Sequence, residues 1–198
     1  MGEHYFSADP SVPFKRAPVR ATVWGHDLAV SSGSGVFAQG RLDIGTSVLL
    51  RETEPPAGGT LLDLGCGYGI IGCALATAAP QATVWGIDVN ERAVLLANEN
   101  AVALALGDRF TAVTPDRVPA DLTFDEIWSN PPIRIGKEAL HALLLTWLRR
   151  LRPGGRAVRV VGKNLGADSL QRWLGEQGYP TTRRASAKGF RVLEARPA

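Results

Sequence analysis

A glycine-rich segment between Leu61 and Gly69 is the first place in the sequence where chemistry is expected. It reads Leu-Leu-Asp-Leu-Gly-Cys-Gly-Tyr-Gly, which predicts an apolar strand that runs into a tight turn and then opens a helix. Glycines in such a turn let the backbone bend sharply and let a ligand approach it closely. Many α/β turns need glycine for structural reasons alone, so this motif needs a second one beside it to indicate binding.

The second motif is an acid at the end of the next apolar run, Val84-Trp-Gly-Ile-Asp88. A carboxylate placed there accepts both hydrogen bonds of a ribose diol, so the two motifs together indicate a nucleoside-containing cofactor. The glycines follow G-x-G-x-G, whereas dinucleotide sites use G-x-G-x-x-G. Asp63 adds a charge that is unfavourable beside a pyrophosphate but favourable near a sulfonium or an amino group, so we favour S-adenosylmethionine. The cofactor-binding residues expected from these motifs are Asp63, Gly65, Cys66, Gly67, Gly69, Asp88 and Val89.

The third motif, Asn130-Pro131-Pro132-Ile133, follows the apolar run 124–129. Proline after Asn130 favours extended backbone there, and two successive prolines remove N–H donors while keeping carbonyl acceptors. The Asn130 side-chain oxygen and the Pro131 carbonyl can then accept both N–H bonds of one amino group, whose lone pair turns toward an incoming methyl group. A plain strand stop is the structural alternative. Beside a cofactor motif we favour catalysis, and all four residues are candidate catalytic residues.

Alternating strand and helix patterns are expected to bring these motifs to one edge of a sheet. Strands are predicted at 60–64, 83–88, 109–114, 124–129 and 155–162, and helices at 69–79, 91–104, 136–151 and 167–177. This alternation implies right-handed crossovers and a parallel α/β sheet, which binds ligands at the carboxyl ends of its strands. Two final strands, 180–186 and 189–196, meet at Lys188-Gly189, too close for a crossover helix, so they are expected to pair as an antiparallel hairpin.

Residues 1–58 are predicted to form a small cap rather than a domain. Runs 21–24 and 28–31 flank Gly25-His26-Asp27, which suggests a hairpin, and residues 42–51 have the spacing of a short helix. The Pro- and Gly-rich stretch 52–59 predicts a linker. We therefore expect one domain over 1–198, with the cap at 1–58 and a Rossmann-like core at 59–198.

Composition excludes several classes of protein. The chain has 198 residues, of which 45% are hydrophobic and 21% charged, a balance typical of a globular α/β domain rather than a disordered or fibrous one. No apolar run approaches the roughly 20 residues of a membrane span, and the N-terminus lacks a signal-peptide pattern, which predicts a cytoplasmic protein with no membrane partner. Cys66 and Cys73 lack zinc-site spacing, so we expect packing residues and no metal.

Charge is distributed unevenly along the chain, whose net charge is +3. Residues 1–133 carry 8 Lys and Arg against 15 Asp and Glu, whereas residues 134–198 carry 14 against 4. This asymmetry suggests an anionic partner for the C-terminal part, and solvated helix faces are the alternative.

Together, D-x-G-x-G-x-G, Asp88 and Asn-Pro-Pro-Ile resemble class I S-adenosylmethionine-dependent methyltransferases of the amino-methylating type. Over nearly its whole length the chain is similar to the RsmC-like family of ribosomal small-subunit RNA guanine-N2 methyltransferases. Further segments that carry this similarity are 4–6, 34–37, 42–46, 88–92 and 188–190. The resemblance implies a seven-stranded sheet with an antiparallel last strand, S-adenosylmethionine as cofactor, and methyl transfer to the N2 amine of a guanine in 16S (small-subunit) ribosomal RNA.

The resemblance also implies roles for three residues. Asp116 occupies the place where such enzymes contact the adenine, although a solvated loop acid is the alternative. Phe37 and Thr46 match cap positions that close over the methionine part of the cofactor; a core anchor and a helix-end residue are the alternatives. Related motifs often end in an aromatic residue that stacks on the target base, whereas Ile133 offers only an apolar face, so stacking must come from elsewhere or be weaker.

Arg134 and Lys137 follow the third motif and are candidate RNA contacts that would hold phosphates flanking a flipped base; solvated loop charges are the alternative. His141 is expected to be structural, because a methylated amine can release its proton to water. We therefore predict a methyltransferase whose partner is ribosomal RNA or the small ribosomal subunit. Rival functions are methylation of another amine, such as protein glutamine, another nucleobase or a small molecule, and a non-catalytic RNA-binding module. The oligomeric state and the nucleotide methylated stay open.

Overall fold

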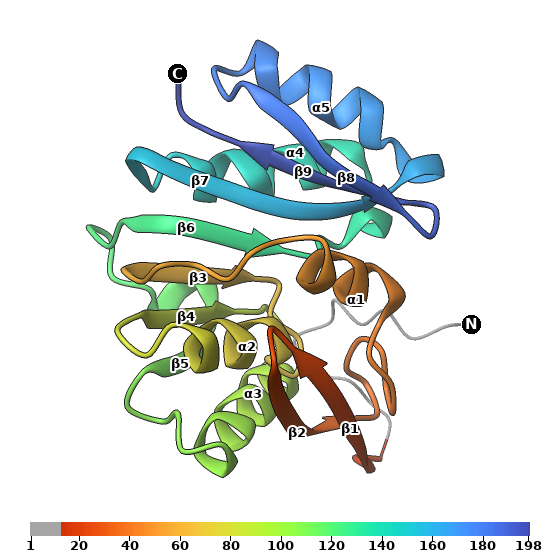
Figure 1. Ribbon diagram of the computed structural model, residues 1–198, viewed down its shortest axis with the longest axis vertical. Helices are drawn as coiled ribbons and strands as arrows, with labels where there is room; N and C mark the ends of the chain where they lie inside the picture. Colours follow the sequence, from red (N-terminus) through yellow and green to blue (C-terminus); the bar gives the residue numbers. More distant parts are fainter. Residues whose placement is uncertain (1–12) are drawn as a thin grey trace.

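A seven-stranded sheet forms the centre of the computed structural model, which describes residues 13–198 apart from the side chain of Arg134 (Figure 1). Its strands are β3 (Thr60–Leu64), β4 (Thr83–Ile87), β5 (Phe110–Val113), β6 (Phe124–Ser129), β7 (Leu151–Gly162), β8 (Thr181–Ala187) and β9 (Phe190–Ala195). They are arranged in the order β5-β4-β3-β6-β7-β9-β8. Strands β3 to β7 pair in parallel, and β9 runs antiparallel to both of its neighbours. The predicted fold, a mostly parallel seven-stranded sheet with an antiparallel last strand, is confirmed.

Helices cover both faces of this sheet and create two hydrophobic cores (Figure 1). The helices are α1 (Ile44–Arg51), α2 (Ile70–Ala78), α3 (Glu91–Ala103), α4 (Lys137–Leu148) and α5 (Ala167–Glu176). Successive residues of a strand point to opposite faces, so Leu61 packs in the core with α1, α2 and α3, while Leu62 and Leu64 pack in the core with α4 and α5. Burial on both faces explains why β3 carries apolar Leu61, Leu62 and Leu64 on both of its sides.

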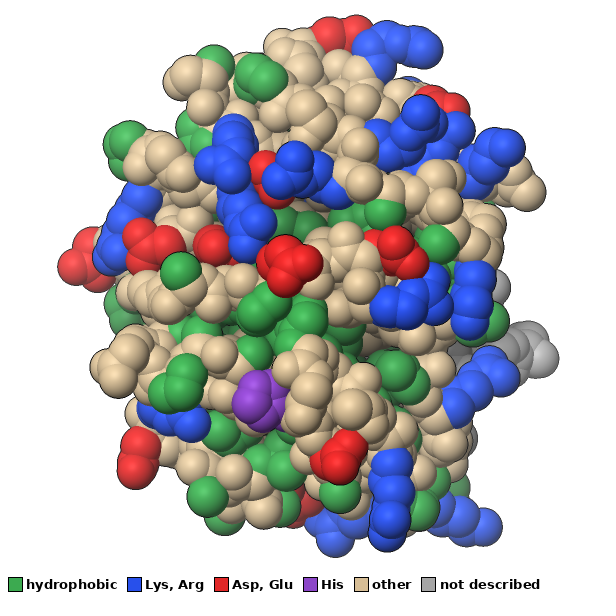
Figure 2. All heavy atoms as spheres, in the orientation of Figure 1, with side chains coloured by type: hydrophobic (Ala, Val, Ile, Leu, Met, Phe, Trp, Pro, Cys, Tyr) green, Lys and Arg blue, Asp and Glu red, His purple; other side chains and the backbone are tan. Residues whose placement is uncertain are grey.

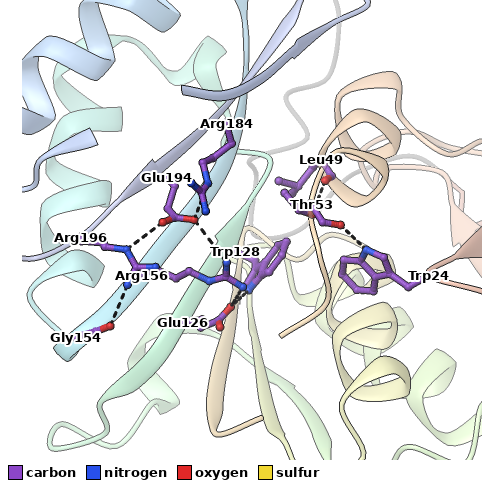
Figure 3. A network of polar contacts seen from close by, with 10 residues as sticks. All are labelled: Trp24, Leu49, Thr53, Glu126, Trp128, Gly154, Arg156, Arg184, Glu194 and Arg196. Carbon is purple, nitrogen blue, oxygen red and sulfur yellow. Dashed lines mark hydrogen bonds and ion pairs between the residues drawn. The ribbon is translucent and has the colours of Figure 1, made fainter. Parts of the chain in front are cut away.

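The N-terminal cap consists of a hairpin and α1. Strands β1 (Arg16–Val23) and β2 (His26–Gly33) pair antiparallel, and β2 packs on α2 and α3. The Trp24 ring meets Trp128 of β6 edge to face at 5.9 Å, and its Nε1 donates to the Thr53 carbonyl just after α1 at 2.7 Å (Figure 3). These contacts attach the hairpin and α1 to the sheet.

Two predicted boundaries are wrong. The hairpin was predicted to turn at Gly25-His26-Asp27, but it turns at Trp24-Gly25, which have φ of +48° and +82°, and His26 already belongs to β2. A two-residue turn with positive φ at both residues matches the twist of the two strands. Helix α4 ends at Leu148, and residue 151, predicted to be helical, begins β7. Leu151 pairs with Phe124 of β6, and a register shift after this pair accommodates Pro153 and the two glycines that follow it, so β7 begins where a helix was predicted.

Several arginines of the basic C-terminal part are held in ion pairs. Glu194 of β9, 5% exposed, pairs with Arg156, Arg184 and Arg196 at 3.5, 3.2 and 3.0 Å (Figure 3). Arg156 also pairs with Glu126 at 3.1 Å. Figure 2 shows basic side chains over the part of this face where β7, β8 and β9 lie, with acidic side chains among them. The charge excess seen in the sequence is therefore partly neutralised in the fold. Among the described residues, no helix is long and apolar enough to cross a membrane.

Candidate active site

A cavity of about 610 Å³ opens at the carboxyl ends of β3, β4 and β6. This is the edge at which open α/β sheets bind ligands. Its walls come from the glycine turn, the ends of β4 and β7, the Asn-Pro-Pro segment, the loop after β2 and one side of α4. The residues that line the cavity include Phe37, Arg41, Asp43, Gly65, Gly67, Asp88, Val89, Pro115, Asn130, Pro131, Pro132, Ile133, Trp147, Leu165 and Phe190.

The glycine turn shapes one wall of this cavity. Gly65 and Gly67 have φ of +74° and +54°, a left-handed conformation that glycine adopts without strain. A Cβ on either residue would have no atom within 3.8 Å, so the missing side chains leave open space beside the backbone. The N–H groups of Gly65 and Cys66 donate to the Ile87 carbonyl at 2.8 and 3.0 Å, which joins the turn to the end of β4.

Asp88 connects two loops at the cavity wall. Its Oδ2 accepts from the Gly67 N–H and its Oδ1 from the Asn90 N–H, both at 2.9 Å. Burial raises the pKa of Asp88 above its ordinary value, and these backbone donors partly oppose the shift. Each carboxylate oxygen keeps a further lone pair, so Asp88 can still accept hydroxyl hydrogen bonds from a ligand.

Asp63 lies behind the turn and not in the cavity lining. It is fully buried, its Oδ2 accepts from the Gly72 N–H at 2.8 Å, and its Oδ1 has no hydrogen-bond partner among the described residues. Burial raises its pKa to about 7; the Gly72 hydrogen bond lowers it and the nearby Asp88 charge raises it further. A buried carboxylate with one unpaired oxygen is suited to a cationic group or a bridging water.

Asn130 follows β6 and its carboxamide is held from behind. Its Nδ2 donates to Asp43 Oδ2 at 2.7 Å and to Thr46 Oγ1 at 3.0 Å. Its Oδ1 accepts no hydrogen bond within the described part of the chain, and Asn130 lines the cavity. The Pro131 carbonyl accepts from the Ile133 N–H at 2.9 Å, which leaves this oxygen one lone pair. The two acceptors of the motif, Asn130 Oδ1 and the Pro131 carbonyl, thus each keep capacity to accept a hydrogen bond.

The loop after β2 forms the cavity wall that carries Phe37. Asn90 caps α3, and its Nδ2 donates to the Gly35 carbonyl at 2.7 Å. The Arg92 guanidinium donates to the Ser34 carbonyl at 3.1 Å. These bonds attach the loop to the residues that follow Asp88, and the Phe37 side chain at the cavity is 44% exposed.

Five predicted cofactor-binding residues lie outside the lining of this cavity. Gly69 and Cys66 belong to the packing: a Cβ on Gly69 would lie 2.8 Å from Ala97 Cβ, and Cys66 is buried. Thr46 lies behind Asn130, Asp63 behind the turn, and Asp116 is exposed in a short helical turn whose Pro115 lines the cavity instead. The other predicted cofactor residues, including Val89, do line it.

A smaller hollow of about 240 Å³ shares Ile133 and Leu165 with the main cavity. Lys137 and His141 line it, and the His141 ring stacks on Trp173 with centroids 3.5 Å apart. This stacking agrees with a structural role for His141. Residues 13–198 hold no group of three His, Cys, Asp or Glu side chains arranged to bind a metal ion.

Comparison with known sequences places this fold and cavity in a family. The sequence pattern of the methyltransferase small domain family matches residues 27–194, which is most of the chain. The chain belongs to this family. The whole cavity lining falls within the matched residues.

Relatives of this methyltransferase family member include proteins of two lengths. The Bacillus subtilis protein YbxB is 36% identical, over 99% of both chains. The ribosomal RNA small subunit methyltransferase C of Pseudomonas aeruginosa is 36% identical over 86% of this chain. Among solved structures, the T. thermophilus 16S rRNA guanine-N2 methyltransferase RsmC, in complex with AdoMet and guanosine, matches 96% of this chain with a TM-score of 0.77 and 25% identity. This chain spans about half the length of each of these two RsmC proteins.

Sequence reasoning missed several cavity residues of this methyltransferase. Asp43 and Arg41 precede α1, and Trp147 and Phe190 come from α4 and β9. Asp43 carried a local signal, since an Asp three residues before Thr46 fits a helix N-cap, and the Thr46 N–H does donate to its Oδ2 at 3.0 Å. Nothing local indicated that the same carboxylate reaches Asn130, 87 residues away along the chain.

Proposed function

We propose that this protein transfers a methyl group from S-adenosylmethionine to the N2 amine of a guanine in small-subunit ribosomal RNA. The observation that carries the proposal is the Asn130 carboxamide, whose oxygen is available in a cavity that also contains the Asp88 carboxylate. The family and the names of the RsmC relatives support the choice of substrate. We further propose one domain over 1–198, with residues 1–58 as a cap, acting in the cytoplasm.

The residues at the glycine turn suit this cofactor. The open space beside Gly65 and Gly67 admits a ligand close to the backbone, and Asp88 keeps lone pairs for the ribose hydroxyls. Asp63, with its unpaired buried oxygen, would hold the cationic methionine end through a direct contact or a water. Val89 and Pro115 would contact the adenine side, with Phe37 closing over the cofactor. When bound, the cofactor supplies an electrophilic methyl group on a sulfonium.

Asn130 and Pro131 would orient the target amine. Two acceptors engage both N–H bonds of the amino group, which points the nitrogen lone pair at the methyl carbon. The nitrogen forms the new N–C bond as the C–S bond breaks with its electrons left on sulfur, and the methylated amine then loses one proton to water. No covalent bond to the protein is needed, so alignment and charge supply the catalysis.

Three lysines near the cavity support an RNA substrate. Lys137 begins α4 just after Ile133, Lys163 follows β7, and Lys188 occupies the β8–β9 turn next to Phe190. The Lys163 N–H donates to the Gly189 carbonyl at 2.8 Å, which keeps the last two segments together. All three are exposed, and none takes part in an ion pair within the described part of the chain, unlike the arginines around Glu194. With Arg134, they would bind phosphates around a flipped base.

The test is transfer of labelled methyl from S-adenosylmethionine to small ribosomal subunits, naked ribosomal RNA and free GTP, followed by nucleoside analysis. We expect N2-methylguanosine from RNA or subunits with the wild type, and loss of transfer with retained cofactor binding in Asn130→Ala. Full turnover by Asn130→Ala would refute the amine-orienting role. Cofactor binding without transfer to any RNA would point to another amine acceptor or to a non-catalytic module.

The RNA surface has its own test. Binding of a 16S RNA fragment should weaken in Lys163→Ala/Lys188→Ala, and the slope of log K against log salt should fall by about 1 to 2. Arg20→Ala is the control, because Arg20 is exposed on β1, a strand that contributes no residue to the cavity lining. Equal losses in both variants would place the RNA elsewhere.

A further inference from the structure

The side-chain NH2 group of Asn130 donates two hydrogen bonds to residues at the start of α1. Asp43 and Thr46, at the start of α1, are the two acceptors of the Asn130 Nδ2 group. A carboxylate only accepts hydrogen bonds, so Asp43 determines which branch of the carboxamide faces it. The nitrogen must point to α1, and the oxygen is left on the cavity side.

We infer that Asp43 and Thr46 are positioning residues that fix the orientation of the Asn130 carboxamide, so that its oxygen meets the target amine. This inference rests on the proposed methyl transfer at Asn130. The terminal torsion of an asparagine is broad and roughly two-fold, so an unrestrained carboxamide samples both orientations. The flipped orientation would set an NH2 donor against the N–H donors of the amine and would block its alignment.

Asp43 is itself held rigidly. It is the N-cap of α1, where its Oδ2 accepts from the Thr46 N–H at 3.0 Å as well as from Asn130. A Cβ on Gly45 would lie 2.9 Å from Asp43 Oδ2 and 3.0 Å from a ring carbon of Phe190, so the site has no room for a larger residue there. The helix start therefore keeps the acceptor in place before substrate arrives, which is what preorganised catalysis requires.

The charge of Asp43 adds a second effect through the same bond. The target nitrogen becomes positive as it takes the methyl group, and the Asn130 oxygen faces that charge. A carboxylate hydrogen-bonded to the other branch of the carboxamide increases the negative character of this oxygen. Asp43 therefore stabilises the positive charge that develops on the target nitrogen, without contacting the substrate.

Matched variants separate this role from folding. Thr46→Val removes one acceptor at nearly constant shape, and Thr46→Ser restores it. Asp43→Ser keeps a good N-cap but is too short to reach Asn130. At saturating cofactor and RNA we expect single-turnover rates to fall about 10-fold in Thr46→Val and about 100-fold in Asp43→Ser, with Thr46→Ser within about 2-fold of wild type. The cofactor Kd should stay within about 3-fold throughout.

A measurement on the ligand-free protein reports the contact without activity. The Asn130 side-chain NH2 signals in a ¹H–¹⁵N spectrum are identified by their loss in Asn130→Ala. We expect slow hydrogen exchange of these signals in the wild type. Exchange should be at least about 10-fold faster in Thr46→Val and Asp43→Ser.

Three results would overturn the inference. One is wild-type transfer rates in both Thr46→Val and Asp43→Ser when the wild type is active. Another is a loss of cofactor affinity in Asp43→Ser with an unchanged saturated rate, which would make Asp43 a cofactor ligand. The last is Asn130 exchange that does not differ between wild type and variants. If the wild type transfers methyl to no acceptor, the proposed function fails, and the exchange measurement still decides whether Asn130 is held.

Discussion

Replacing Asp63 by asparagine should stabilise the ligand-free protein above neutral pH. Asp63 is fully buried with one unpaired oxygen, and burial raises its pKa from 3.8 to about 7. Between pH 3.8 and about 7, the Asp63 carboxyl is therefore protonated in the folded state but ionised in the unfolded state. The free energy of unfolding falls as pH rises through this range. The difference corresponds to about 4 kcal/mol as an upper bound.

Asparagine removes this titration but keeps an oxygen for the Gly72 N–H. Its new NH2 group is a buried donor in the place of an unpaired oxygen, which costs about 1 to 3 kcal/mol. We therefore expect Asp63→Asn to be more stable than the wild type by about 1 to 3 kcal/mol at pH 8, and to lose this advantage below about pH 5.

Urea unfolding from pH 4.5 to 8.5 measures the effect as the difference between the two curves. Asp116→Asn is the control, because this acid is exposed and should leave the pH dependence over this range unchanged. Parallel curves for wild type and Asp63→Asn would show that Asp63 does not titrate in this range in the folded protein. The proposed function adds a second readout: cofactor affinity should fall in Asp63→Asn although the protein is more stable, because the negative charge behind the turn that would attract the cationic cofactor is gone.

Four further substitutions test other parts of the structure. Asp88→Asn offers one acceptor where the structure uses two, so cofactor Kd should rise at least about 10-fold by calorimetry; an unchanged Kd contradicts the ribose contact. Gly69→Ala should destabilise the protein more than Gly65→Ala does, because both residues have positive φ but only a Cβ on Gly69 would meet Ala97, at 2.8 Å. Gly65→Ala should in addition weaken cofactor binding, because its Cβ would occupy open space at the cavity; the reverse pattern would exchange their roles. Glu194→Gln should cost about 1 kcal/mol in urea unfolding with activity per folded molecule kept, since three arginines lose a charged partner but Arg184 and Arg196 are half exposed and Arg156 keeps Glu126.

Local patterns predicted the parts of the fold that depend on neighbours in sequence. The strand β3 was placed at its correct bounds because its apolar run is buried on both faces, and the turn after it needs glycine at φ of +74°. The hairpin of β8 and β9 followed from a connection too short for a helix. The boundary of α4 was missed because an irregular pairing between β6 and β7, and not the local sequence, determines where β7 begins.

The candidate site was predictable where one segment supplies both backbone and side chain. Asp88 and Asn130 fall at strand ends, so their place at the sheet edge follows from the topology. Asp63 and Gly69 share the same motif, yet only three-dimensional packing shows that they lie behind the cavity surface. The Asp43 contact joins segments 87 residues apart, and a single sequence gives no signal for such a pair.

The order of the strands places acidic and basic residues on opposite sides of Asn130 along the sheet edge. Asn130 ends β6, which stands between β3 and β7 in the sheet. On the β3 side lie Asp63 and Asp88, and on the β7 side lie Lys163 and Lys188. In the proposed function, this separation would attract the cationic cofactor to one half of the edge and the RNA backbone to the other. Asn130 lies between the two halves, which is where the proposed transfer needs the two ligands to meet.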